Sequence, residues 1–141
     1  MFKTILLPVD FAQESSWKKA LPVALTLRGA YGAALHLVSV IPSVLHGGVE
    51  QYFPDNYEEK LRDDTNASMK AFIAEHLAGK GAISHIVQGP IYHRIIETAE
   101  KIGADLIVMG SHRPALADYL IGPNAARVVR HTSCSVMVVR E

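Results

Sequence analysis

Five short apolar runs alternate with longer amphipathic stretches along this chain. Short runs that are apolar almost throughout, rather than at every second position, are typical of parallel strands covered on both faces. The stretches between them show helical periodicity. This alternation predicts an α/β fold with a single open, mostly parallel five-stranded sheet and helices on both faces. The expected strands are residues 4–9, 35–41, 83–87, 106–109 and 135–139.

The first expected helix carries local signals for its start and its end. Ser15 and Ser16 can cap the start, and Gly32 can end the helix in a left-handed conformation. Pro22 is expected about two turns inside this helix, where it is predicted to kink or locally loosen the helix. The remaining helices are expected at residues 55–77 and 91–102 and after Gly122-Pro123, while residues 43–54 lack periodicity and predict a loop or lid.

The most informative segment lies near the end of the chain. The fourth strand stops at Gly110, a long loop follows, and Gly122-Pro123 opens a short amphipathic helix. Ligands of open α/β sheets bind beyond the carboxyl ends of the strands, and helix N-termini attract phosphate. We expect Gly110 to lie beside Asp10, which follows the first strand. The segment predicts a phosphate or nucleotide site, and its alternative is an ordinary surface connection.

Composition narrows the class of protein further. The chain has 141 residues, is 49% hydrophobic, and carries 14 basic and 14 acidic side chains. A net charge of zero gives no electrostatic reason to expect nucleic acid or an anionic membrane as a partner. No apolar run reaches the roughly 18–20 residues that span a bilayer. The single cysteine, Cys134, excludes an internal disulfide framework. The chain length predicts one domain over residues 1–141, and these features together predict a cytoplasmic protein.

The residues that follow the expected strands exclude several nucleotide-binding folds. The chain has no GxxxxGK[ST] phosphate loop, and no GxGxxG follows the first strand. A receiver domain requires an aspartate after the third strand, where Gln88 and Gly89 stand.

The residues instead resemble the universal stress protein family over the whole chain. The resemblance rests, in order, on KTILLPVDFAQES, LHLVSVIP, VQGPIYHRIIETAEKIGADLIVMGSHR and RVVRHTSCSVMVVR. The segment SHRP…YLIG is similar to the corresponding segment in the small single-domain bacterial branch of the family. The resemblance implies an adenine nucleotide alpha hydrolase-like fold and homodimerisation through the last strand, Ser135–Val139. An apolar strand at a chain end also needs to be covered or paired.

Nucleotide-binding members of the family carry a Gly, two residues, a Gly, nine residues, and a Gly followed by Ser or Thr. Gly110 matches the first Gly, and Ser111 and His112 match the two spacers. Arg113 stands in place of the second Gly, and the next interval is one residue shorter. Gly122 then matches the third Gly.

Pro123 replaces the Ser or Thr of that motif, which has a physical cost. With Gly122 as N-cap, the site loses one hydroxyl donor and one backbone N–H, although Asn124 and Ala125 still present theirs. Hydrogen bonds to charged groups contribute about 1.5–3 kcal/mol each, so phosphate binding weakens by roughly one to three orders of magnitude. The Arg113 guanidinium either offsets this loss by gripping phosphate or fills the phosphate space.

The resemblance also places the rest of the nucleotide. Adenine is expected against Pro8, Val9 and Val40, with Met109 in the same site and Asp10 near adenine or ribose. An alternative role for Asp10 is to hydrogen-bond its own loop at the entry to the first helix.

The remaining chemistry-bearing residues favour structural roles. His36 lies within a strand and is interpreted as a packed or edge histidine, and the seven histidines form no metal-binding motif. No nucleophile motif surrounds the serines.

The sequence therefore predicts a homodimeric protein that binds ATP or AMP and acts in stress regulation or protection, without dedicated catalysis. Two alternatives stay open. One is a slow nucleotide hydrolase or autophosphorylating protein, although no general base or metal-binding carboxylate pair stands near the motif. The other is a ligand-free module that docks an unidentified protein partner.

Overall fold

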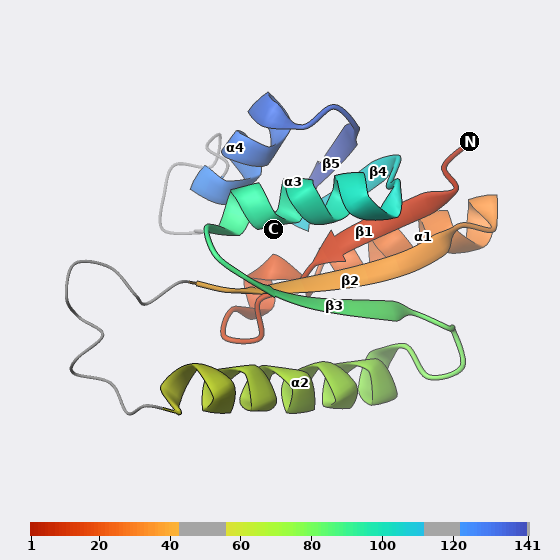
Figure 1. The fold of residues 1–141 in the computed structure, drawn as a ribbon. Coiled ribbons are helices and arrows are strands. Elements are labelled where there is room, and N and C mark those ends of the chain that lie inside the picture. The colour runs from red at the N-terminus through yellow and green to blue at the C-terminus, as the bar shows by residue number, and fades with distance from the viewer. Residues whose placement is uncertain (43–55, 112–121, 141) are drawn as a thin grey trace.

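A five-stranded parallel sheet forms the centre of the molecule (Figure 1). The computed structural model describes residues 1–42, 56–111 and 122–140, so the expected loop at residues 43–54 lies outside the described residues. The strand order is β3-β2-β1-β4-β5, and every neighbouring pair is parallel. The strands are β1 Thr4–Pro8, β2 Ala34–Ile41, β3 Ile83–Gln88, β4 Leu106–Gly110 and β5 Ser135–Val139. The predicted fold class is confirmed.

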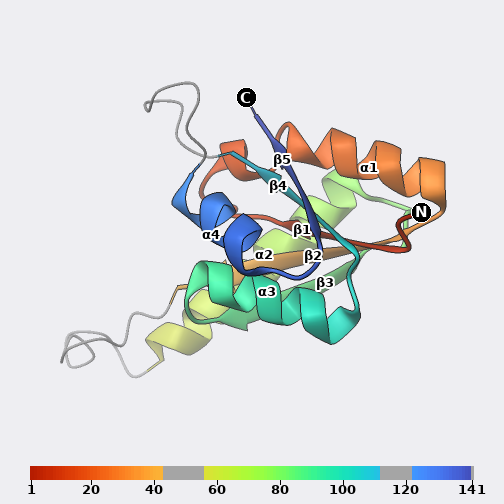
Figure 2. The ribbon, with the colours of Figure 1, turned by 90° about the horizontal axis from the view of Figure 1, so that it is seen from above.

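Helices cover both faces of the sheet, as Figures 1 and 2 show. α1 (Ala20–Tyr31) and α2 (Tyr57–His76) pack on one face, and α3 (Ile91–Ile102) and α4 (Pro123–His131) pack on the other. In β1, Ile5 and Leu7 join the core under α1 and α2, whereas Leu6 joins the core under α3 and α4. Burial on both faces explains why the strands are apolar almost throughout.

The start of α1 corrects the sequence prediction. Ser16 lies in a short 3-10 turn, η1 (Glu14–Ser16), where its hydroxyl donates to the Gln13 carbonyl at 2.8 Å instead of capping α1. The helix begins later, at Ala20, with no side-chain cap. Pro22 therefore falls in the first turn, where its missing N–H would have no helical partner, and the helix runs unbroken to Tyr31. The expected position of Pro22 two turns inside the helix is wrong, and the reason to expect a kink there is removed.

Asp105 links the amino ends of β1 and β4 through hydrogen bonds. Its carboxylate accepts hydrogen bonds from the backbone N–H of Lys3 at 2.8 Å and of Thr4 at 3.1 Å. Burial acts to raise the pKa of Asp105, but these backbone hydrogen bonds outweigh it and hold the pKa below its ordinary value. Because β1 and β4 are neighbours, Asp10 just after β1 and Gly110 at the end of β4 lie at adjacent strand ends, where the topology argument expected them.

Among the described residues, no helix combines the length and apolarity needed to cross a membrane.

Candidate ligand-binding site

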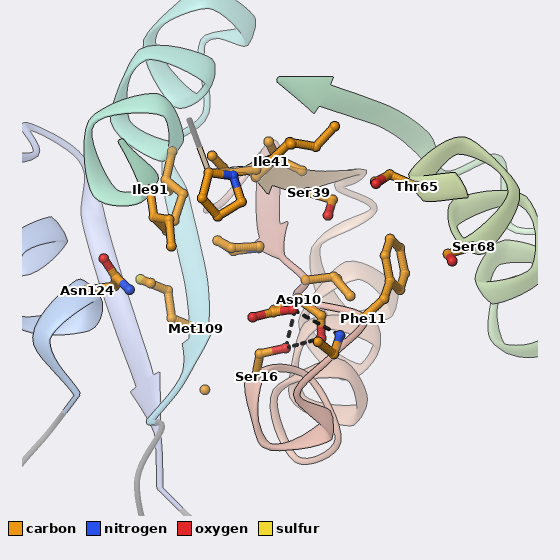
Figure 3. A pocket seen from close by; sticks show the side chains of 18 of the residues that line it. Asp10, Phe11, Ser16, Ser39, Ile41, Thr65, Ser68, Ile91, Met109 and Asn124 are labelled. Carbon is orange, nitrogen blue, oxygen red and sulfur yellow. Dashed lines mark hydrogen bonds between the residues drawn. The ribbon is translucent and has the colours of Figure 1, made fainter. Parts of the chain in front are cut away.

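A pocket of about 430 Å³ opens at the carboxyl edge of the sheet (Figure 3). Its walls come from the ends of β1, β2 and β4, the turn after β1, and the helices α2, α3 and α4. At this point the sheet changes the direction in which strands are added: β2 and β3 lie on one side of β1, and β4 and β5 lie on the other side. In open α/β sheets such a switch point is the expected ligand site.

The interior of the pocket is largely apolar. Val9, Val38, Ile95 and Met109 line it and are almost fully buried, and Val40 adds a half-buried surface. Ligand pockets of this kind hold flat apolar groups and use a few polar groups at their edges to fix orientation. The site therefore suits a ligand with one flat, weakly polar part.

The turn after β1 places Asp10 at the pocket wall. One carboxylate oxygen, Oδ1, accepts a hydrogen bond from the Ala12 N–H at 2.9 Å, and the Asp10 N–H donates to the Ser16 hydroxyl at 2.9 Å. Asp10 thus closes its own loop, as one of the two sequence interpretations expected. Its second oxygen has no hydrogen-bond partner among the described residues and is available to a ligand.

Gly110 is required for packing at the end of β4. A Cβ at this position would lie 2.5 Å from the Ser15 carbonyl oxygen and 2.7 Å from that of Ser16. Both oxygens belong to η1 at the foot of the pocket. The glycine therefore permits the turn after β1 to lie against β4, which is a structural reason for Gly110 independent of any ligand.

The N-terminus of α4 borders the pocket through Asn124. Gly122 is the N-cap in an extended conformation, and Pro123 is the exposed first residue of the helix. Asn124 lines the pocket, whereas Ala125 is 3% exposed and belongs to the core under α4. The first turn of α4 thus offers an amide side chain and positive dipole end to a ligand.

A polar wall that the sequence analysis missed lies on the far side, where α2 contributes Asp64, Thr65 and Ser68. Figure 3 shows Thr65 and Ser68 on α2 across the pocket from Asn124, with Ser39 of β2 between these sides. The one available signal was Ser39, a polar residue inside an apolar strand close to its carboxyl end. Nothing in the helical pattern of α2 marks the other three residues.

The structure brings together part of the predicted site. At the pocket wall stand Pro8, Val9, Asp10, Val40, Met109, Gly110 and Asn124. Ser111 follows β4 and donates its N–H to the Val139 carbonyl at 2.9 Å, which extends the pairing with β5. His112 and Arg113 lie outside the described residues. Among the described lining residues the ionisable side chains are both acidic, Asp10 and Asp64.

A histidine pair lies outside the pocket. The rings of His36 on β2 and His85 on β3 are nearly parallel, with His36 Nδ1 2.9 Å from His85 Nε2. Burial lowers the pKa of both histidines, and the charges of His36 and Lys101 lower that of His85 further. His36 is thus packed against a neighbouring strand, as the sequence analysis interpreted it. In the described part of the chain, no cluster of three or more metal-ligating side chains occurs.

A parallel sheet in this strand order, covered by helices on both faces and with a pocket at its switch point, defines an open α/β class of protein. Within that class, the model of the Universal stress protein family matches residues 1–140. The chain belongs to the universal stress protein family.

Individual relatives agree with this assignment. The chain is 31% identical over 143 aligned residues to Universal stress protein G of Escherichia coli O157:H7, and the alignment covers 99% of this chain and 100% of that protein. Among solved structures, the hypothetical protein MJ0577 has a TM-score of 0.75 at 28% identity, covering 100% of this chain and 97% of that one. A universal stress protein solved in complex with cAMP shares the fold, with a TM-score of 0.62 at 21% identity, covering 99% of this chain and 97% of that one.

Proposed function

We propose that this universal stress protein binds an adenine nucleotide, ATP or AMP, in the pocket at the β1–β4 switch point. Bound nucleotide then serves a regulatory or protective role in the stress response, without dedicated catalysis. The observation that carries the proposal is the shape of the pocket: an apolar slot that ends at the first turn of α4. The slot suits a base, and the helix N-terminus suits a phosphate.

The proposed nucleotide lies across the strand ends. The base packs between Pro8, Val9 and Val40, and the free oxygen of Asp10 accepts a hydrogen bond from a ribose hydroxyl. The phosphate points toward Asn124 at the start of α4, beside Met109 and Gly110. The cAMP complex of a protein with this fold supports the choice of ligand class.

The phosphate end is the weak part of the proposed site. Pro123 offers no N–H, and Asp10 and Asp64 contribute negative charge. The sequence motif makes His112 or Arg113 the proposed source of a compensating cation. A site with few phosphate contacts gains little from a second or third phosphate. We therefore expect AMP and ATP to bind with similar affinity.

The test begins with the protein as purified. Mass spectrometry of the supernatant after denaturation identifies any adenine nucleotide carried by the protein, and calorimetric titration with ATP and AMP measures affinity. Gly122→Val, which places a branched side chain at the N-cap of α4, is expected to weaken binding at least about tenfold. No carried nucleotide and no binding heat up to millimolar ligand would refute the proposal.

A second candidate function is a ligand-free module that docks a protein partner. Pro123 at the first position of α4, together with the acidic lining of the described pocket, favours this candidate. It is the function that remains if nucleotides fail to bind.

The proposed assembly is a homodimer joined through β5. This strand lies at one edge of the sheet and pairs with β4 alone among the described strands. Met137 at its centre is 38% exposed. An apolar edge strand requires a cover, and a second copy of the chain supplies one.

A further inference from the structure

Ser39 presents a hydroxyl to the pocket that has no hydrogen-bond partner among the described residues. The residue is only 5% exposed and lines the pocket, and its side chain makes no hydrogen bond to another described residue. Figure 3 shows the hydroxyl directed into the space between the turn after β1 and α2. Because this hydroxyl is accessible from the pocket, a ligand group can pair with it, and such a hydrogen bond adds affinity.

Thr65 faces the same space with a hydroxyl that can only accept. Its proton is committed to the Leu61 carbonyl, to which Oγ1 donates at 2.7 Å. The remaining lone pairs of Oγ1 are available to a ligand. Asp64, the preceding residue of α2, also lines the pocket and adds a carboxylate, which is another acceptor.

The two sides together form an edge with a hydrogen-bond donor at Ser39 and acceptors at Thr65 and Asp64. The Ser39 hydroxyl rotates freely and can donate to a ring nitrogen, while Thr65 and Asp64 can accept only from an N–H group. A 6-aminopurine has this pattern, with an amine beside a ring nitrogen, whereas a 6-oxopurine presents an oxygen in place of the amine. Acceptors that face an oxygen leave it unpaired, which disfavours the 6-oxopurine.

The location of this wall fits the base rather than the phosphate. Thr65 and Ser68 lie across the pocket from Asn124, which marks the phosphate end at the start of α4 (Figure 3). We infer that Ser39, Thr65 and Asp64 form the base-discriminating end of the pocket and select a 6-aminopurine over a 6-oxopurine. The inference rests on the proposed nucleotide-binding function and assigns specificity within that site.

The experiment compares adenosine monophosphate with inosine monophosphate, which carries oxygen at position 6, by calorimetric titration. The unaltered protein is expected to prefer the adenosine ligand by about tenfold or more. Thr65→Val is expected to reduce the preference for adenosine monophosphate about 3- to 10-fold and to change inosine monophosphate binding by less than about twofold. Ser39→Ala removes a hydroxyl that can pair with the ring nitrogen of either ligand, so it is expected to weaken the binding of both. Thr65→Ser keeps the hydroxyl and is expected to retain the preference. Asp64→Asn, which introduces an N–H donor, is expected to strengthen inosine monophosphate binding.

Thr26→Val is the matched control. Thr26 also donates its hydroxyl to the carbonyl four residues earlier, Pro22 at 2.9 Å, but it stands exposed on α1, away from the pocket lining. Its substitution is expected to leave the ligand ratio unchanged.

The outcomes separate this inference from the proposed function. Equal binding of the two monophosphates by the unaltered protein, or an unchanged affinity ratio in Thr65→Val, overturns the inference and leaves nucleotide binding in place. Failure of both ligands to bind overturns the proposed function and the inference with it. Thermal unfolding of each variant identifies any loss of fold.

Discussion

Gly110 shows how one missing side chain determines the shape of the pocket. The Ser15 and Ser16 carbonyl oxygens lie where its Cβ would stand, at 2.5 and 2.7 Å. Because backbone atoms cannot rotate away, Gly110→Ala forces β4 and η1 apart. We expect the free energy of unfolding to fall by about 1–3 kcal/mol, measured as a lower urea midpoint at unchanged slope.

Gly29→Ala is the control for that substitution. Gly29 lies inside α1, and a Cβ there meets nothing within 4 Å. Because alanine favours helix, this variant is expected to be more stable by about 0.5–1 kcal/mol. Equal stability of Gly110→Ala and the unaltered protein would contradict the assigned packing role.

The His36–His85 pair makes stability depend on pH. Burial lowers the pKa of both histidines in the folded protein, so the unfolded chain binds more protons once the pH falls below about 6.5. The contribution of the pair is complete above that pH and is lost as the pH falls toward the lowered folded values. We expect urea midpoints to decrease from pH 7.5 to pH 5.5.

His85→Gln removes one titrating group of the pair and is expected to reduce this pH dependence. His93→Gln, which changes an exposed histidine on α3, is expected to preserve it. The same pH dependence in both variants would show that the acid sensitivity arises elsewhere.

At the scale of elements, the N-terminus of α4 limits phosphate binding. Pro123 at its first position is exposed and supplies no N–H. Pro123→Ser adds a backbone N–H and a hydroxyl at the predicted phosphate end. We expect AMP affinity to rise about tenfold and adenosine affinity to stay constant, both measured by calorimetric titration.

Pro22→Ser provides the matched control, since Pro22 is an exposed proline in the first turn of α1. It is expected to leave both affinities unchanged. An equal gain for AMP and adenosine in Pro123→Ser would mean that the added groups do not contact phosphate.

The elements themselves were largely predictable. Every strand begins and ends within one residue of its expected bounds, because burial on both faces imposes a continuous apolar run. The start of α1 was not predictable, because Ser16 satisfies the turn after β1 through Asp10 and Gln13. A serine before a helical pattern serves a cap or a turn equally well, and only the folded contacts distinguish them.

At the scale of the whole molecule, the exposed β5 edge predicts assembly. Met137→Asp places a charge at the centre of the proposed dimer interface, where Met137 is 38% exposed in the monomer. Because burying an unpaired charge is costly, the dimer dissociation constant is expected to rise at least about tenfold. Sedimentation velocity over a range of protein concentrations measures this change.

Ile83→Asp at the opposite edge of the sheet tests the assignment of the interface. Ile83 lies on β3 and is 49% exposed, so it is also an exposed apolar residue of an edge strand. This variant is expected to dimerise as the unaltered protein does. Dissociation by Ile83→Asp and not by Met137→Asp would place the interface on β3 instead.

The sequence by itself determined the fold class, the family and one side of the candidate site. These follow from local information: apolar runs, helical spacing, and residues such as Pro8, Asp10 and Gly110 that adjoin strand ends. Because neighbouring parallel strands end at the same edge of the sheet, the sequence alone predicts that residues following those strands lie close together.

Only the tertiary structure decided the opposite wall of the pocket and the reason for Gly110. Thr65 lies in the middle of α2, and helical periodicity does not say which distant strand end that surface will face. The packing of α2 beside β2 brings Thr65 to the same pocket as Ser39. The close approach of η1 to β4 is likewise a contact between segments far apart in the chain, and such contacts depend on how the layers pack.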